Sequence, residues 1–97
     1  FAFCDIAIGS SIGRHCIIGR NTLIGHHAAI GNNCITRPSV IVNGKSRVGN
    51  NCMLQTRSTV TNRSMVCDDV ELLAFGAITK NITQAGRYAG TPARKIA

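Results

Sequence analysis

At 97 residues the sequence can form one small domain, and it has no Trp and only 4% aromatic residues. So few large side chains argue against a β-sandwich or a helical bundle of ordinary composition. Eleven Lys and Arg against four acids give a formal charge of +7, which favours anionic partners such as a phosphorylated cofactor.

Aliphatic residues occupy every sixth position from Ile6 to Ile78, with Thr36 as the one exception. The residue two places before each of them is small or β-branched, as in Cys16, Thr22 and Ala28. A glycine or asparagine often follows the aliphatic residue directly, and we expect a positive φ at these corner positions. They are Gly13, Gly19, Gly25, Gly31, Asn43 and Gly49.

Alternation of inward residues with a turn every six residues predicts very short strands joined by tight corners. Three sides make an 18-residue coil, and the segment 30–34 (IGNNC) recurs 18 residues later as 48–52 (VGNNC). We therefore predict an all-β parallel solenoid of just over four coils over residues 1–80. Residues 81–97 are predicted to form a short irregular tail. Because the chain begins at Phe1 inside the repeat, we expect a domain cut from a longer protein with an N-terminal domain.

This pattern resembles the hexapeptide-repeat family over roughly residues 4–80. The resemblance implies a left-handed parallel β-helix and a homotrimer with sites between subunits. A short solenoid also buries little by itself, which fits self-association.

The cysteines predict core packing rather than a disulfide or a zinc site. Cys4, Cys16, Cys34 and Cys52 occupy the small inward position, and their spacings of 12 and 18 match no zinc signature. Cys67 falls at a corner. Free thiols persist in a reducing compartment. No apolar run reaches the ~18–20 residues of a membrane span and no signal-peptide pattern opens the chain, so we predict a cytoplasmic protein.

The three histidines fall at corners, where we expect them to face solvent. His26 shares its column with Gly44 one coil above, so an imidazole is expected beneath backbone that carries no side chain. Such an imidazole could take a proton from an amine or a hydroxyl, and a nearby N–H could stabilise an oxyanion. His27 shares its column with Lys45 and Arg63, which makes this corner positive.

The segment from Ile24 to Gly49 resembles the sialic acid O-acetyltransferases and the bacterial amino-sugar N-acetyltransferases. The resemblance implies His26 as the catalytic base and Gly44 as the oxyanion residue. An acid or amide usually follows the catalytic histidine, but here that residue is His27. Either another group orients the His26 ring or His27 is the working base.

The stretch from Tyr88 to Ile96 contains Gly-x-Pro-Ala and resembles the closing motif of hexapeptide transferases. This resemblance implies a coenzyme A groove near the last coils. Gly76 and Ala77 would then offer backbone contacts to pantetheine, with Gly44 near the thioester. Basic side chains suit the phosphates. The candidates are Lys80, Arg87, Arg94 and Lys95.

The predicted function is transfer of an acetyl group from acetyl-CoA to an amino or hydroxyl group of a sugar or nucleotide sugar. No metal, nucleic acid or membrane span is predicted, and no zinc-finger, helix-turn-helix or RNA-binding aromatic motif is present. The first alternative is a non-catalytic oligomerisation or regulatory solenoid. The second is a γ-class carbonic anhydrase, but that class needs two histidines five residues apart, and the residue five places after His26 is Gly31.

Overall fold

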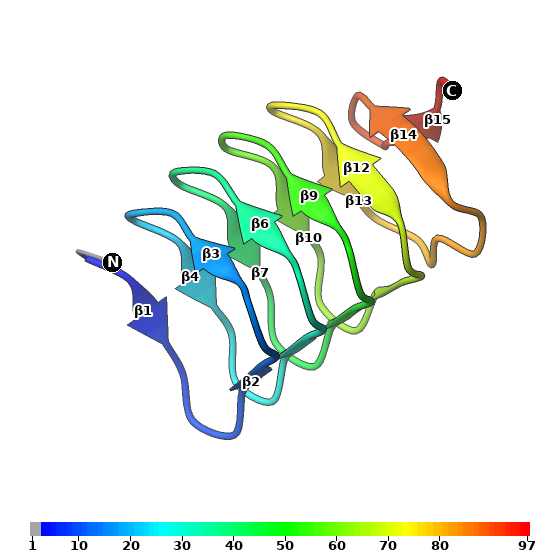
Figure 1. The fold of residues 1–97 in the computed structure, drawn as a ribbon. Coiled ribbons are helices and arrows are strands. Elements are labelled where there is room, and N and C mark those ends of the chain that lie inside the picture. Colours follow the sequence, from blue (N-terminus) through cyan, green and yellow to red (C-terminus); the bar gives the residue numbers. More distant parts are fainter. Residues whose placement is uncertain (1–2) are drawn as a thin grey trace.

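A computed structural model describes residues 3–97 and shows a three-sided β-solenoid without helices (Figure 1). Phe1 and Ala2, which the predicted solenoid segment includes, lie outside the described residues. The strands are β1 Asp5–Ile6, β2 Ser11–Ile12, β3 Ile17–Ile18, β4 Leu23–Ile24, β5 Ala29–Ile30, β6 Ile35–Thr36, β7 Ile41–Val42, β8 Arg47–Val48, β9 Met53–Leu54, β10 Thr59–Val60, β11 Met65–Val66, β12 Val70–Leu72, β13 Ala77–Ile78, β14 Gly86–Ala89 and β15 Arg94–Lys95. No helix among the described residues is long and apolar enough to cross a membrane.

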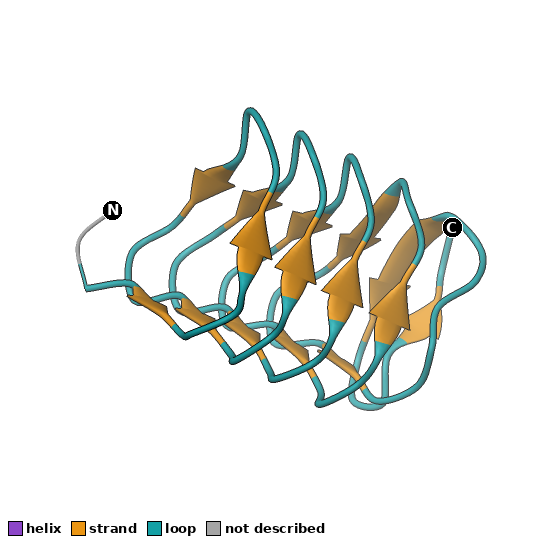
Figure 2. Ribbon diagram, turned by 90° about the horizontal axis from the view of Figure 1, so that it is seen from below, coloured by secondary structure: helices purple, strands orange, loops and turns teal. Residues whose placement is uncertain are grey.

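The strands stack into three flat sheets, one on each side of the solenoid (Figure 2). Sheet 1 has the order β1-β4-β7-β10-β13, sheet 2 has β2-β5-β8-β11, and sheet 3 has β3-β6-β9-β12-β14-β15. Leu23 pairs with Ile41 and Ala29 pairs with Arg47, so every coil stands on the residues 18 places earlier. The predicted 18-residue coil is confirmed.

The winding of the coil is left-handed. In Figure 1 the chain advances from N to C by rising along the nearer strands β3, β6 and β9 and descending along the fainter strands β4, β7 and β10. The fold class that the hexapeptide resemblance implied is therefore confirmed, including its handedness.

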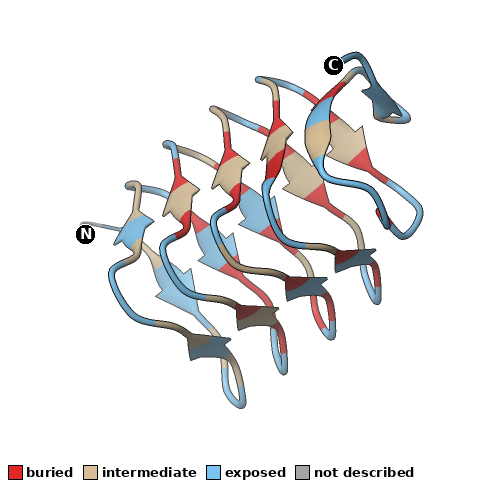
Figure 3. Ribbon diagram, turned by 45° about the vertical axis from the view of Figure 1, so that its right-hand side comes forward, coloured by how far each residue is buried: buried red, intermediate tan, exposed pale blue. Residues whose placement is uncertain are grey.

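Aliphatic and small side chains fill the interior of the solenoid. In Figure 3 the buried residues, drawn in red, recur from coil to coil along it. Every sixth residue from Ile24 to Ile78 is buried, including Thr36 at 1% exposure. The small residues two places earlier are buried too, as in Ala28 and Ser46. Ile6 is 52% exposed although it keeps the register, because no coil covers it on the N-terminal side among the described residues.

The corner glycines differ from the expectation. Positive φ occurs two residues after them, at positions such as His15 (φ 58°), His27 (φ 57°) and Asn33 (φ 58°). The glycines themselves allow close stacking: a Cβ on Gly19 would lie 2.7 Å from the carbonyl carbon of Arg37, in the coil above. The predicted positive φ at these glycines is therefore wrong, and the residue is small there because backbone approaches backbone.

The tail extends the solenoid instead of leaving it. Ile82 forms a parallel bridge with Val66, which supplies a side on sheet 2, and β14 pairs in parallel with β12 on sheet 3. These two sides complete a fifth coil beyond the predicted four. The chain then reverses, and β15 pairs antiparallel with β14. The tail was predicted to be irregular, but much of it is ordered on the last coil.

Cys34 and Cys52 are buried in the core as predicted, Cys16 packs against it, and Cys4 is only half-buried on the first coil and outside the core cluster; all five are free thiols. Cys34 is 1% exposed and its thiol donates to the Gly49 carbonyl at 3.1 Å. The adjacent Cys34 thiol, followed by burial, raises the pKa of Cys52, which keeps this group a neutral thiol. Neutral, hydrogen-bonded sulfur suits a packing role.

Replacing Gly19 by Ala should lower the free energy of unfolding by about 1–3 kcal/mol, because the new Cβ must displace backbone of the next coil. Urea unfolding followed by circular dichroism measures this. Arg37→Ala is the matched control, since it leaves a Cβ at the equivalent position one coil above and should be near neutral. Equal stability of both variants would contradict the close-stacking explanation.

Candidate active site

The corner between sheets 1 and 2 brings His26 and Gly44 together, one coil apart. A Cβ built on Gly44 would lie 2.8 Å from His26 Nε2 and 3.2 Å from Cε1. The imidazole therefore occupies the space that a side chain at residue 44 would fill. His26 is exposed to solvent and Gly44 is buried, so the ring stands at the surface with its Nε2 edge against the backbone of the next coil.

The amide of Gly44 has no acceptor among residues 3–97. At the corner between sheets 2 and 3 the equivalent amides are capped from the coil above: Arg14 N–H donates to Asn32 Oδ1 at 2.8 Å, and Asn32 N–H to Asn50 Oδ1 at 2.8 Å. In the His26 column Asn62 instead donates its Nδ2 to the Gly44 carbonyl at 2.8 Å. An unpaired N–H thus lies beside the His26 ring.

His27 turns the other way along the solenoid axis. Its ring lies against Gly9, one coil below, where a Cβ would stand 2.5 Å from His27 Cδ2 and 2.7 Å from Nε2. Its Nδ1 is 3.3 Å from Nδ1 of His26, with the two rings nearly perpendicular at 85°. Sequence reasoning placed both histidines at this corner. It missed the contact between their rings, because the side chains of consecutive residues normally point away from each other.

The corner is positively charged. Lys45 and Arg63 are exposed above His27 in the same column, and Lys45 N–H donates to the His26 carbonyl at 2.9 Å. The acids Asp68, Asp69 and Glu71 belong to the opposite side of the solenoid, at the corner between sheets 2 and 3 and on sheet 3. The fourth acid, Asp5, lies on β1 of sheet 1, one coil below Leu23. Basic side chains thus outnumber acids around the His26 corner among the described residues, and anionic ligands are favoured there.

An apolar groove crosses sheet 2, the side of the solenoid that follows the Gly44 corner along the chain. It has a volume of about 440 Å³, and its walls come from β8, β11 and the tail segment 81–83. Arg47, three residues after Gly44, and Met65 lie on the strand side, and Ile82 closes the far rim. Sequence reasoning missed this groove because its rim comes from the non-repeating tail.

The predicted coenzyme residues fall into separate places. Gly76 and Ala77 lie at the start of β13, but their N–H groups already donate to the carbonyls of Leu73 and Gly90. They therefore offer no free donor to pantetheine. Lys80 and Arg94 come together at a small cavity of about 110 Å³ that also touches Ile82.

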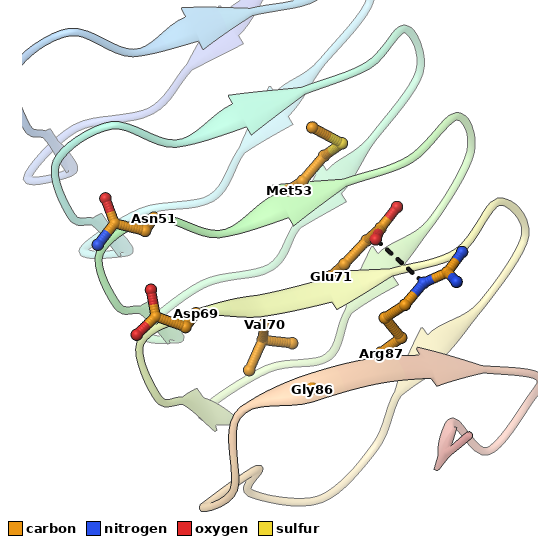
Figure 4. A pocket seen from close by; sticks show the side chains of 7 residues that line it. All are labelled: Asn51, Met53, Asp69, Val70, Glu71, Gly86 and Arg87. Carbon is orange, nitrogen blue, oxygen red and sulfur yellow. Dashed lines mark ion pairs between the residues drawn. The ribbon is translucent and has the colours of Figure 1, made fainter. Parts of the chain in front are cut away.

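Arg87 and Lys95 lie elsewhere. Arg87 is on sheet 3, where its Nε pairs with Glu71 at 3.2 Å beside a hollow of about 340 Å³ (Figure 4). Lys95 extends along β15 against Gly86. Sheet 3 faces away from the corner between sheets 1 and 2, so this pair is remote from His26.

No protein-family model matches the sequence, and no curated protein matches it. Solved structures match its fold. Serine acetyltransferase from Neisseria gonorrhoeae superposes with a TM-score of 0.89 at 16% identity, covering 97% of this chain and 41% of that one. A variant of perosamine N-acetyltransferase from Caulobacter crescentus, in complex with CoA and GDP-perosamine, gives 0.71 at 17% identity, covering 95% and 52%.

The acetyltransferase domain of PglB from N. gonorrhoeae, in complex with acetyl coenzyme A, gives 0.70 at 16% identity, covering 97% of this chain and 55% of that one. This chain thus spans about half the length of these proteins. The resemblance to hexapeptide-repeat acyltransferases is confirmed at the level of the fold.

The unpaired Gly44 amide can be tested by hydrogen exchange. Its N–H should exchange much faster than those of Asn43 and Lys45, which donate to the Val60 and His26 carbonyls, because exchange at Gly44 breaks no hydrogen bond. Amide exchange followed by NMR resolves the three residues. Protection at Gly44 equal to that of its neighbours would mean that the amide is engaged and unavailable to a ligand.

Proposed function

We propose that this chain is an acyl-CoA-dependent acyltransferase that moves an acetyl group from acetyl-CoA to an amino or hydroxyl group of a sugar or nucleotide sugar. The observation that carries the proposal is that His26 Nε2 lies against Gly44, whose N–H has no acceptor among the described residues. A base and an oxyanion donor within one corner are the two groups that direct acyl transfer needs.

In the proposed mechanism the amine or hydroxyl of the acceptor attacks the thioester carbonyl with its lone pair. His26 Nε2 accepts the proton that the attacking nitrogen or oxygen gives up. The Gly44 N–H donates to the carbonyl oxygen as negative charge develops there. When the carbonyl reforms, the carbon–sulfur bond breaks and the proton on His26 passes to the departing thiolate. Direct attack needs no acyl-enzyme, and the buried thiols of Cys34 and Cys52 face away from the corner.

The apolar groove on sheet 2 supports coenzyme A as the donor. Its volume of about 440 Å³ falls in the range of small-molecule sites, and its apolar wall suits the pantetheine arm. Arg47 at the groove, with Lys45 and Arg63 at the corner, could meet the phosphates. These residues replace Gly76, Ala77, Arg87 and Lys95 as our first candidates, while Lys80 and Arg94 stay candidates near the Ile82 rim.

The solved structures support the substrate class. The perosamine enzyme is described with GDP-perosamine, a nucleotide sugar, and CoA. We carry over a sugar or nucleotide-sugar acceptor, a homotrimer with sites between subunits and a cytoplasmic location as parts of the proposal. A neighbouring subunit or another domain would then complete the acceptor site.

The donor test is calorimetric titration of the purified chain with acetyl-CoA and with CoA. We expect saturable binding near one site per chain, weakened by a combined Lys45→Ala, Arg47→Ala and Arg63→Ala substitution. Replacing Arg20, Arg37 and Arg57 by Ala instead provides a charge-matched control, because these exposed residues lie at the corner between sheets 3 and 1. A well-folded oligomer that binds neither ligand would favour a non-catalytic oligomerisation solenoid.

His26→Ala should lower kcat by ~10²–10⁴ while acetyl-CoA binding and thermal stability stay unchanged. Release of the CoA thiol measures turnover once a screen of amino sugars and nucleotide sugars has yielded an acceptor. His15→Ala is the control, because His15 is an exposed corner histidine far from Gly44 in the sequence. An unchanged kcat would remove His26 from the mechanism.

A further inference from the structure

We propose that His27 is the positioning residue for His26: its Nδ1 accepts a hydrogen bond from His26 Nδ1–H and so fixes the ring and tautomer of the base. This inference rests on the proposed function, because it assigns the group that makes His26 able to take a proton. It treats His27 as acting through His26 rather than on the substrate.

The geometry that carries the inference is the 3.3 Å contact between the two Nδ1 atoms. A neutral imidazole carries one proton, on either Nδ1 or Nε2, so a hydrogen bond across this contact needs one Nδ1 to donate and the other to accept. With the rings nearly perpendicular at 85°, the contact is an edge approach between nitrogens and not a stack. The two histidines therefore set each other's tautomers.

Only one of the two arrangements serves acyl transfer. If His26 carries its proton on Nδ1, its Nε2 is bare and directed at the corner of Gly44, ready to accept a proton. If His27 donates instead, His26 must carry its proton on Nε2 and cannot act as a base. The productive pair is His26 Nδ1–H to bare His27 Nδ1, which leaves the His27 proton on Nε2 beside Gly9.

The local backbone holds His27 in place for this task. Its φ of 57° lies in the left-handed region, and its N–H donates to the Ile8 carbonyl at 3.1 Å. The ring rests on Gly9, whose missing side chain makes room for it. Gly44 makes room for His26 in the same way, so each imidazole ring packs against a glycine of the coil that it faces.

The pair also supports the charge that forms during the reaction. When His26 Nε2 takes the acceptor's proton, the ring becomes a cation and its Nδ1–H becomes a stronger donor to His27. The groups around His27 are Lys45 and Arg63 in the coils above, which carry positive charge, and the uncharged Gly9 and Ile8 below. An imidazole therefore replaces a carboxylate as a neutral acceptor at a corner already rich in positive charge.

Imidazole nitrogen NMR on the protein without substrate tests the tautomers directly. Two-dimensional ¹⁵N–¹H spectra identify which ring nitrogen carries the proton, and single replacement of each histidine assigns the three rings. We expect His26 as the Nδ1–H form and His27 as the Nε2–H form at a pH where both are neutral. His26 in the Nε2–H form would overturn the proposal, whether or not the protein proves to be a transferase.

Substitutions at His27 separate positioning from structure. His27→Leu removes the acceptor, and we expect kcat to fall about 10–100-fold and the Nδ1–H signature of His26 to be lost. His27→Asn restores an acceptor oxygen and tolerates the left-handed backbone, so most of kcat and the His26 tautomer should return. His15→Leu is the matched control, because His15 has nearly the same φ of 58°.

The outcomes distinguish the two proposals. Loss of the His26 tautomer in His27→Leu and its return in His27→Asn support the positioning role even if no acceptor is found. Equal kcat and an unchanged His26 tautomer in His27→Leu would overturn it while leaving His26 as the base. Activity lost in His27→Leu and in His27→Asn alike, with the His26 tautomer unchanged in both, would make His27 itself the base.

Discussion

The rest of the structure depends on the vertical register of 18 residues. Because each coil repeats the one below it, a residue's neighbour above is fixed by sequence number alone, as Leu23 with Ile41 and Ala29 with Arg47 show. The neighbour of a corner side chain in the next coil is therefore set by the register and not by side-chain packing. The residue 18 places away determines whether a histidine ring has space and whether a corner amide finds a hydrogen-bond acceptor. It also determines which charges gather in one column. The same rule that fills the core with aliphatic residues also places His26 beneath Gly44.

The corners of the solenoid share the same backbone geometry but differ in which side chains bond to their amides. Between sheets 2 and 3, Asn32, Asn50 and Asp68 cap the amides below them and make a ladder of hydrogen bonds. Between sheets 1 and 2 no such ladder forms among the described residues, because Gly44 has no side chain to cap His26 and Asn62 donates to the Gly44 carbonyl instead of capping its amide. The amides of this column therefore lack side-chain caps, and the many backbone hydrogen bonds between coils compensate for that loss.

Much of this arrangement could be predicted from the sequence. The period of six gives the strands, and the repeat of IGNNC as VGNNC gives the coil length, so the His26–Gly44 column follows by arithmetic. The positive φ was assigned to the wrong corner residue, because glycine can signal either backbone freedom or close approach, and here Gly19 and Gly25 serve the second. The sheet 2 groove and the fifth coil were missed because Ile82 and β14 belong to a tail without a period. The contact between His26 and His27 depends on rotamers, which repeats do not encode.

The tail has a consequence for how copies of this chain can associate. Parallel sheets of stacked coils end in a row of open N–H and C=O groups, on which another chain could continue the stack. At the C-terminal end, Gly90 and Ala93 bond to the backbone of Ala77, Ile82 bridges Val66, and the antiparallel β15 closes sheet 3. Among residues 3–97, these contacts cover part of the last coil with the chain's own tail and leave fewer of its backbone groups open for end-to-end stacking. This arrangement favours sideways association through the faces and corners of the solenoid, which include the corner of His26 and Gly44.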